Sequence, residues 1–444
     1  MRQVNIGLVG IGTVGGGVFR ALQKNADLLA SRLGLRLKLA IVAEKDMERC
    51  RRAAVPPEMI TNDWTHLVAD PDIHIIIELI GGKGVARELI LAALRAGKPV
   101  VTANKALLSA HGEELFAAAA ASRTSLYYEA SVAGGVPILK VLREALIGNE
   151  ISSIHGIVNG TCNYILTRMK LEGAEFADVL RQAQQLGFAE AEPSLDIDGH
   201  DALHKAGILA SLAHGFWVDP KQIHVEGIRA VTKLDIQFAG QLGYTIKLLG
   251  IVKQLGSSKA GKPSRRSPAG IQVSVYPTLI PNAHVLASVN LEYNAILVRG
   301  NVVGDTLYYG RGAGPDATAS AILSDLAEAA LDLKSGGRTA VPTFVPHGPS
   351  GRVVPIDETI SKYYVRLSVI DKPGTLARIA TILGRSKIGI SSVIQPEGHE
   401  GESVPLILMI HDAPNSAMRK ALERIAKLNV IRGQPTMIRV ESFE

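Results

Sequence analysis

One short stretch of the chain, Gly187–Lys205, places five carboxylates ahead of a lysine. Asp201 stands four residues before Lys205, so a helix would bring both side chains to one face. The apolar run that follows, 206–213, indicates that this helix is buried. A buried lysine beside carboxylates is costly unless it has a function, such as donating a proton to a reacting oxygen. The alternative is an exposed ion pair worth roughly a few tenths of a kcal/mol. The five carboxylates belong to Glu190, Glu192, Asp196, Asp198 and Asp201.

A glycine-rich turn near the N-terminus is the second candidate site. It follows a strand pattern and opens a helix pattern, which is the context in which such a turn binds the pyrophosphate of a dinucleotide. Gly10 permits a tight turn, Gly12 lets the main chain approach the phosphate, and Gly15 lets helix and strand pack closely. A tight strand–helix turn without a ligand is the alternative. The candidate cofactor-binding residues are Gly10, Ile11, Gly12, Thr13, Val14 and Gly15.

Two later strand ends carry polar residues that could contact the same ligand. Glu44 and Lys45 follow the second strand and offer both an acid for a ribose hydroxyl and a base for a 2′-phosphate, so NAD and NADP both remain open. Thr102 ends another strand, and Lys105 follows it. Ligands of parallel sheets lie at the carboxyl ends of the strands, and a lysine is unfavourable at a helix N-terminus. We therefore predict that Thr102 and Lys105 contact cofactor or substrate; a solvent-exposed lysine is the alternative.

Alternating strand and helix patterns position these residues. An alternation of this kind predicts an α/β domain with a parallel sheet, here a Rossmann-type dinucleotide-binding domain over residues 1–135. The expected strands are Val4–Val9, Leu35–Val42, Ile73–Leu79, Pro99–Thr102 and Ser125–Tyr128, and the expected helices are Thr13–Leu33, Val85–Ala96 and Glu113–Ala121.

The pattern changes after residue 135. We expect an α+β catalytic and dimerisation domain over 136–313, with a helix at Val136–Ile147, a strand at Ser152–Val158 and a strand-rich run at Gln272–Leu297. A helix at Pro315–Leu333 would complete the first domain within about 314–340. A Gly- and Pro-rich linker is expected at 341–361. Residues 362–444 read strand, helix, strand, strand, helix, strand, the order of a ferredoxin-like unit.

Composition excludes several classes of protein. The 444 residues are 47% hydrophobic and 20% charged, which excludes intrinsic disorder. We find no membrane-span pattern and no signal-peptide pattern, and Cys50 and Cys162 are too few for a disulfide framework, so we expect a cytoplasmic protein. The net charge of +6 comes largely from one basic stretch, Lys253–Arg266, so we expect no nucleic-acid partner.

These motifs together resemble a monofunctional homoserine dehydrogenase with a C-terminal ACT domain, over essentially the whole chain. The run Gly187–Lys205 is the most specific match, and Thr102–Lys105, Asn159-Gly160-Thr161 and the Glu226-Gly-Ile motif also match. The sequence departs from the family at Glu192-Pro193, where Asp-Pro is commoner, and in the basic insertion near 257–267. The resemblance implies the reversible NAD(P)H-dependent reduction of L-aspartate 4-semialdehyde to L-homoserine, in threonine, methionine and isoleucine biosynthesis.

The resemblance also assigns roles to individual residues. Lys205 would be the general acid, and Asp201 would orient it and help to bind substrate. Glu190 would hold the substrate ammonium, and Lys105 would span cofactor and substrate. The substrate-binding set implied by the family is Glu190, Asp196, Asp201 and Lys205, and Gly312 joins the cofactor-binding set.

The resemblance implies a monovalent cation, such as sodium, for the segment 129–136. Its ligands would be the Glu129 carboxylate and main-chain carbonyls near Val132, Gly134 and Val136. A glycine-rich hinge is an equally good interpretation of that segment.

The C-terminal unit is implied to be a sensor of small molecules. The residues Asp371, Gly374, Thr375 and Leu376 match the family's effector loop, and L-threonine is the implied effector. The turn suits an amino acid, because free N–H groups could take its carboxylate and Asp371 its ammonium. A purely structural dimerisation domain is the alternative. We expect a homodimer or homotetramer, because the run Gln272–Leu297 would be hazardous as an exposed sheet edge.

Two rival functions remain open. Cys162 could be the nucleophile of a semialdehyde dehydrogenase that forms a thioester, with His155 close in sequence, but a small buried cysteine is the commoner case. A dinucleotide-sensing regulator would account for both ends of the chain, but it leaves the cluster Glu190–Lys205 unexplained.

Overall fold

The computed structural model describes residues 2–256, 270–337, 340–347, 351–396 and 401–443, so most of the basic stretch lies outside the described residues. The chain divides into two compact units, which we describe separately. The first unit comprises Met1–Val158, His204–Lys221 and Asn294–Gly351, and the second comprises Asn159–Leu203, Gln222–Tyr293 and Arg352–Glu444. Within the described residues, we find no helix that combines the length and the apolar character needed to cross a membrane.

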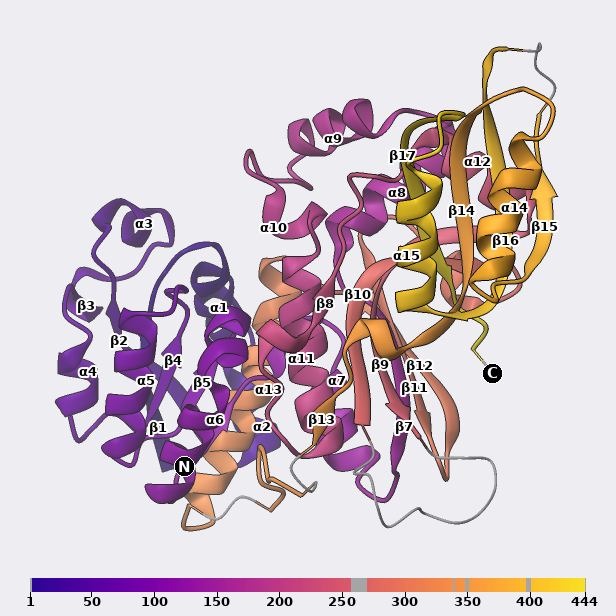
Figure 1. The fold of residues 1–444 in the computed structure, drawn as a ribbon. Helices are drawn as coiled ribbons and strands as arrows, with labels where there is room; N and C mark the ends of the chain where they lie inside the picture. The colour runs from indigo at the N-terminus through magenta and orange to yellow at the C-terminus, as the bar shows by residue number, and fades with distance from the viewer. Residues whose placement is uncertain (1, 257–269, 338–339, 348–350, 397–400, 444) are drawn as a thin grey trace. The chain divides into compact units, whose positions relative to one another are not determined.

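A parallel sheet in the order β3-β2-β1-β4-β5-β6 forms the centre of the first unit (Figure 1). This is the Rossmann strand order, and it confirms the predicted parallel sheet. The strands are β1 (Arg2–Val9), β2 (Leu35–Ala43), β3 (Ile60–Thr61), β4 (Ile75–Glu78), β5 (Val100–Thr102) and β6 (Leu126–Tyr127).

Helices cover the sheet. On one face α13 (Pro315–Lys334) packs against α1 (Thr13–Lys24), and both helices share an apolar core with β1 and β2. The single helix expected over Thr13–Leu33 is wrong: α1 ends at Lys24, Asn25 is the cap residue, and α2 (Ala26–Leu33) follows it. The Asn25 amide side chain donates to the carbonyl of Ala21 at 3.0 Å, in competition with the helical pattern. The remaining helices of this region are α3 (Met47–Arg52), α4 (Thr65–Ala69), α5 (Val85–Arg95) and α6 (Lys105–Ala121).

The rest of the first unit contains the sheet strands β7 (Ile151–Ile157), β11 (Tyr293–Gly300) and β12 (Gly304–Arg311), with β12 at the edge. The regular helix expected over Val136–Ile147 is wrong. A short α7 (Ile138–Lys140) passes into a π-helix (Val141–Ala145), closed by a 2.8 Å bond from the Leu146 amide to the Val141 carbonyl. Helix α11 (His200–His214) begins in the second unit and continues into the first.

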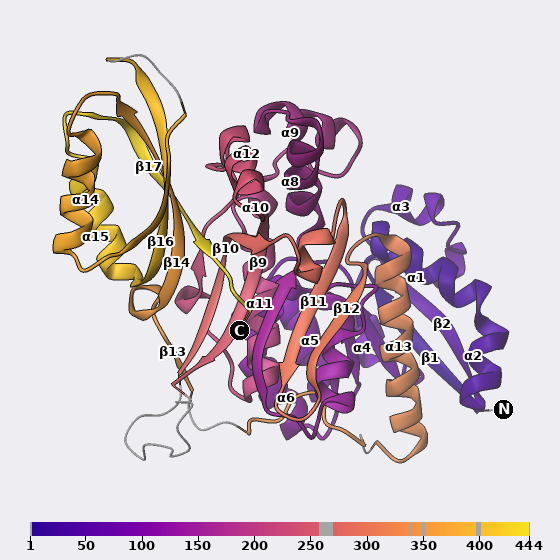
Figure 2. The same cartoon turned by 90° about the vertical axis from the view of Figure 1, so that its right-hand side faces the viewer.

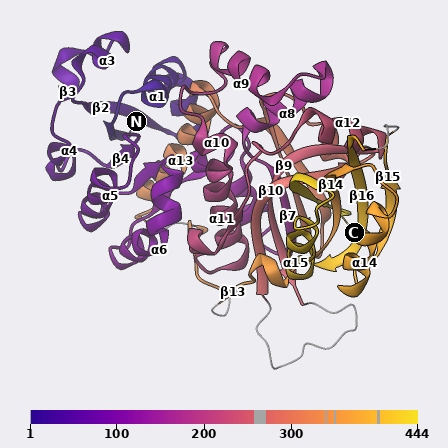
Figure 3. The same cartoon turned by 45° about the horizontal axis from the view of Figure 1, so that its top comes forward.

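The second unit is built on the long hairpin of β9 (Tyr244–Leu255) and β10 (Gly270–Pro281). The other edge of β10 pairs with β8 (His224–Val225), β13 (Arg352–Val353) and β17 (Ile431–Val440). The chain covers both edges of β10 itself, so an exposed edge of β10 gives no reason for a second subunit, and the oligomeric state stays a prediction. Helices α8 (Gly160–Glu172) and α9 (Phe176–Gln185) pack together (Figure 3), and this part of the unit also contains α10 (Ser194–Ile197) and α12 (Lys233–Gln241).

The C-terminal part of this unit has the predicted βαββαβ order. Its antiparallel strands lie in the order β17-β14-β16-β15, and α14 and α15 pack against one face of the sheet (Figure 2). The elements are β14 (Ile360–Ile370), α14 (Thr375–Arg385), β15 (Ile390–Ile394), β16 (Ser403–Pro414) and α15 (Asn415–Ile425). Part of the segment predicted as a linker forms β13, and β14 begins at Ile360. Because β13 and β17 both pair with β10, the C-terminal part shares a sheet with the rest of its unit.

Candidate active site

The glycine-rich turn has the geometry that its sequence predicts. Gly10 has a φ of 97°, which favours glycine, and α1 begins at Thr13. A Cβ at Gly15 would lie 2.1 Å from the Gly10 carbonyl oxygen, so close packing at this position requires glycine. A Cβ at Gly12 would meet no atom within 4 Å, so the main chain there is open to a ligand.

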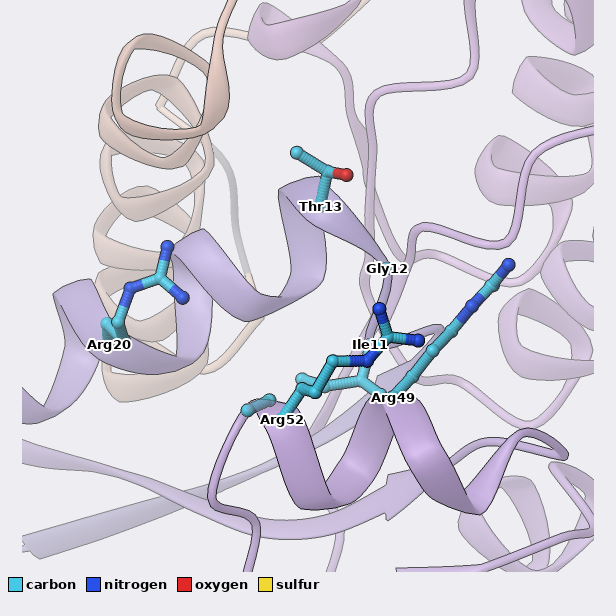
Figure 4. A pocket seen from close by; sticks show the side chains of 7 residues that line it. Ile11, Gly12, Thr13, Arg20, Arg49 and Arg52 are labelled. Carbon is cyan, nitrogen blue, oxygen red and sulfur yellow. The ribbon is translucent and has the colours of Figure 1, made fainter.

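A cavity of about 490 Å³ adjoins this turn and carries three arginines that the sequence analysis missed. Arg49 and Arg52 extend from α3, and Arg20 lies on α1 (Figure 4). Guanidinium groups and the N-terminus of α1 suit phosphate oxygens. The sequence does contain a signal for this site, the Arg-rich segment just after Glu44. In this fold an arginine near that position binds the 2′-phosphate of NADP.

Glu44 closes the other side of the turn. Its Oε2 accepts from the Ile11 amide at 3.0 Å, and its Oε1 accepts from the amides of Lys45 and Asp46 at 2.9 and 3.0 Å. The carboxylate is therefore fixed at the end of β2 by main-chain donors.

Glu78 is a further residue that the sequence analysis missed. It is fully buried at the end of β4, where its carboxylate accepts from the Thr102 hydroxyl at 2.7 Å and from the amides of Ile80 and Gly81. Burial raises the pKa of Glu78. Thr102 in turn accepts from the Asn104 amide, and Asn104 caps α6, whose first residue is Lys105. Glu78 thus fixes two loops at the carboxyl ends of β4 and β5.

Asn159 organises the acidic cluster of the second unit. Its Nδ2 donates to Asp196 Oδ1 at 2.7 Å and to Asp201 Oδ2 at 2.9 Å. Its Oδ1 accepts from the Cys162 amide at 2.8 Å and so caps α8. The Thr161 hydroxyl also donates to Asp196, at 3.1 Å. Two of the predicted substrate-binding carboxylates are therefore held together by one amide.

Lys205 stands one helical turn after Asp201 on α11. It is 7% exposed, as the apolar pattern predicted, and its Nζ donates to the Val158 carbonyl at 2.6 Å. Glu190, in contrast, lies on an exposed turn between α9 and α10, and the structure does not bring it into the Asn159 network. Two neighbouring acids have other contacts: Glu192 accepts from the Ser194 amide, and Asp198 pairs with Arg229.

The segment predicted to hold a cation contains a buried carboxylate. Glu129 is 3% exposed, and its two oxygens accept from the amides of Leu139 and Lys140 at 3.0 and 2.7 Å. Burial raises its pKa to about 8, and the nearby Asp325 adds to the effect. Val132, Gly134 and Val136 are buried in the same loop, and Gly312 lies in the turn between β12 and α13. The Glu129 carboxylate is therefore buried and fixed by two main-chain amides, in the loop that carries the other three predicted ligands.

The predicted effector loop joins β14 to α14. Gly374 has a φ of 86° and precedes the first helical residue, Thr375, whose hydroxyl donates to the Ile370 carbonyl. The Asp371 carboxylate accepts a hydrogen bond from the side-chain amide of Gln395 at 3.0 Å. Leu376, in the first turn of α14, is 40% exposed.

Cys162 is fully buried, and its thiol donates to the Asp196 carbonyl at 3.2 Å. Cys162 therefore lies in the first turn of α8, next to the main chain of Asp196.

The strand order and the glycine-rich turn define a dinucleotide-binding protein with a second, acidic site. Comparison with known proteins specifies it further. Residues 10–129 match the NAD-binding domain of homoserine dehydrogenase, and residues 137–327 match the homoserine dehydrogenase family itself. A homoserine dehydrogenase of Pseudomonas aeruginosa is 41% identical over 448 residues, with 100% of both chains covered.

Solved structures agree with this assignment. A homoserine dehydrogenase from Thiobacillus denitrificans superposes with a TM-score of 0.92 at 40% identity, over 99% of each chain. A hyperthermophilic archaeal homoserine dehydrogenase in complex with NADPH has a TM-score of 0.62 at 27% identity, over 74% of this chain and 98% of that one. The chain belongs to the homoserine dehydrogenase family, whose members are NAD(P)-dependent oxidoreductases acting on a CH–OH group.

Proposed function

We propose that the chain interconverts L-aspartate 4-semialdehyde and L-homoserine, with Lys205 as the acid–base residue. The observation that carries the proposal is that the side-chain amide of Asn159 binds both Asp196 and Asp201. Asp201 stands one helical turn before Lys205 on α11. The two carboxylates would bind the polar groups of the amino-acid substrate, and Glu190 would reach its ammonium from the exposed turn. The test is L-homoserine-dependent reduction of NADP or NAD, followed at 340 nm.

The reaction needs a hydride at the aldehyde carbon and a proton at the carbonyl oxygen. A bound nicotinamide would supply the hydride, which would form the new C–H bond at the aldehyde carbon. Lys205 Nζ donates its proton to the carbonyl oxygen, which gains the negative charge, and the neutral amine regains a proton from solvent. The Val158 carbonyl fixes the position of Nζ at 2.6 Å. Lys105 would stabilise the developing alkoxide with its charge.

NADP is the cofactor that the described residues favour over NAD. Arg49 and Arg52 provide positive charge next to the turn, and Glu44 is engaged by main-chain amides. A guanidinium binds a phosphate through paired, charge-assisted hydrogen bonds, which an adenosine without a 2′-phosphate cannot accept.

Sodium at Glu129 is the second proposed ligand. The test compares the melting temperature in sodium chloride with that in choline chloride at equal ionic strength. We expect sodium to raise it in the native protein and not in Glu129→Gln; equal responses of both proteins would contradict the assignment.

The C-terminal βαββαβ unit is proposed to be an ACT domain that binds L-threonine and inhibits the enzyme. Deleting the unit is a poor test, because removal of β17 would expose part of an edge of β10. Asp371→Ala is the better variant, because in this proposal Asp371 takes the ligand ammonium. Inhibition should weaken in this variant while uninhibited turnover is kept, and unchanged inhibition would place the effector elsewhere.

We propose assembly as a homodimer through β12, with a homotetramer as the larger form. Strand β12 is an edge strand, and apolar side chains are exposed on it and on the turn before it. These side chains belong to Val302, Val303, Leu307 and Tyr309. Light scattering at micromolar concentration is the test, and a monomer would contradict the proposal.

A further inference from the structure

Arg439 is a buried arginine on β17, in the C-terminal βαββαβ unit. It forms an ion pair with Glu226, the residue that follows β8. It is 2% exposed, and its guanidinium reaches Glu226 Oε1 and Oε2 at 3.0 and 3.1 Å. It also donates to Asn415 at 2.8 Å and lies over the Tyr276 ring, 4.4 Å from the ring centre. A guanidinium fixed in four ways leaves little freedom to the carboxylate that it holds.

The segment 224–229, which contains Glu226, lies against α10, the short helix that carries Asp196. The Ile228 amide donates to the Ile197 carbonyl at 2.8 Å, and both side chains are fully buried. A Cβ at Gly227 would lie 2.2 Å from that carbonyl oxygen, so the two main chains touch. Arg229 then binds both carboxylate oxygens of Asp198, at 2.5 and 3.1 Å, and the Ser194 hydroxyl at 2.9 Å.

Glu226 has two further contacts, one with His224 and one with β10. His224 Nε2 lies 2.7 Å from Glu226 Oε1, and the Glu226 amide donates to Val275 on β10. Against the effect of burial, which raises it, the hydrogen bond from His224 and the charge of Arg439 hold the pKa of Glu226 below its ordinary value.

We propose that Arg439 is a positioning residue for Asp196, one of the side-chain carboxylates assigned to substrate binding. Through Glu226 it fixes the segment 224–229, which in turn fixes α10 and Asp196. The inference rests on the proposed role of Asp196 in binding the amino-acid substrate. Through this contact the C-terminal unit would complete the substrate site, in addition to any effector that it binds. A change in β17 would therefore alter substrate affinity before it altered proton or hydride transfer.

The test compares Arg439→Gln, Glu226→Gln and the double variant with the native chain. The matched control is Lys253→Met, which removes an ion pair between β9 and Glu441, just beyond β17. We expect the KM for L-homoserine to rise about tenfold in each single variant. The KM for NADP and kcat should stay within about twofold, and the double variant should be no worse than either single variant.

Three results would overturn the proposal: an unchanged KM for L-homoserine in Glu226→Gln, an equal rise in Lys253→Met, or additive effects in the double variant. If Arg439→Gln does not fold, Glu226→Gln decides alone, because it keeps a polar side chain of the same size. A native chain without homoserine-dependent activity would refute the proposed function instead, so the two failures are distinct.

Discussion

Replacing Asn159 with Asp should disable the substrate site without removing the cap of α8. Aspartate is as good an N-cap as asparagine, so the bond to the Cys162 amide can be kept. The Nδ2 donor is lost, however, and a third carboxylate then faces Asp196 and Asp201, at positions where the present contacts are 2.7 and 2.9 Å.

The size of the effect follows from those two bonds. A hydrogen bond to a charged group contributes about 1.5–3 kcal/mol, so losing both costs about 3–6 kcal/mol before the site relaxes. At about 1.4 kcal/mol per tenfold change, kcat/KM for L-homoserine should fall by at least about 100-fold.

The assay is initial-rate homoserine oxidation, with urea unfolding as a measure of stability. Asn159→Ala is the comparison, because it also loses the cap, which adds about 1 kcal/mol of instability. If Asn159→Asp folds and its kcat/KM stays within about threefold of the native value, which is under 1 kcal/mol, the two carboxylates do not act together on substrate.

Three further predictions follow from buried or charged groups. The double variant Arg49→Gln/Arg52→Gln should raise the KM for NADP by at least about tenfold and leave the KM for NAD unchanged, because only NADP presents a 2′-phosphate; equal losses for both cofactors would contradict the NADP assignment. Cys162→Ser should keep near-native turnover, because the thiol is buried and bonded to the main chain; loss of activity in a folded variant would support the rival thioester mechanism. Burial lowers the pKa of Lys247 to about 7 in the folded chain. In the unfolded chain this lysine keeps its proton up to the higher, ordinary lysine pKa. Above pH 7 the unfolded chain therefore binds more protons than the folded chain. Stability should therefore rise with pH above 7 by at most about 1.4 kcal/mol per unit; Lys247→Met should remove this slope in urea titrations, and a slope that persists would show that another group causes it.

The sequence was most informative where local chemistry decides the structure. The period of the apolar runs and the spacing of Gly10, Gly12 and Gly15 predicted the parallel sheet and its open turn, because both depend on neighbours along the chain. The same reasoning predicted a buried Lys205, since an apolar run follows it directly.

Contacts between distant segments could not be predicted in this way. Glu78 reaches Thr102 and Arg439 reaches Glu226 only because strands far apart in sequence pair in the folded chain. Asn159 matched the family as part of Asn159-Gly160-Thr161. Its bonds to two carboxylates could not be predicted, because one side-chain amide produces no repeating pattern in the sequence. The break at Asn25 and the π-helix after Lys140 each depend on one or two hydrogen bonds, which an apolar pattern does not contain.

The most direct test of the central claim is the kcat of Lys205→Met in homoserine oxidation with NADP. The methionine keeps the length and the apolar stem of the buried side chain, but it cannot carry a proton. We predict that kcat falls by roughly 10²–10⁴-fold while the KM for NADP stays within about twofold, because the assigned role is proton transfer. A folded Lys205→Met enzyme with near-native kcat would contradict the assignment of Lys205 as the acid–base residue.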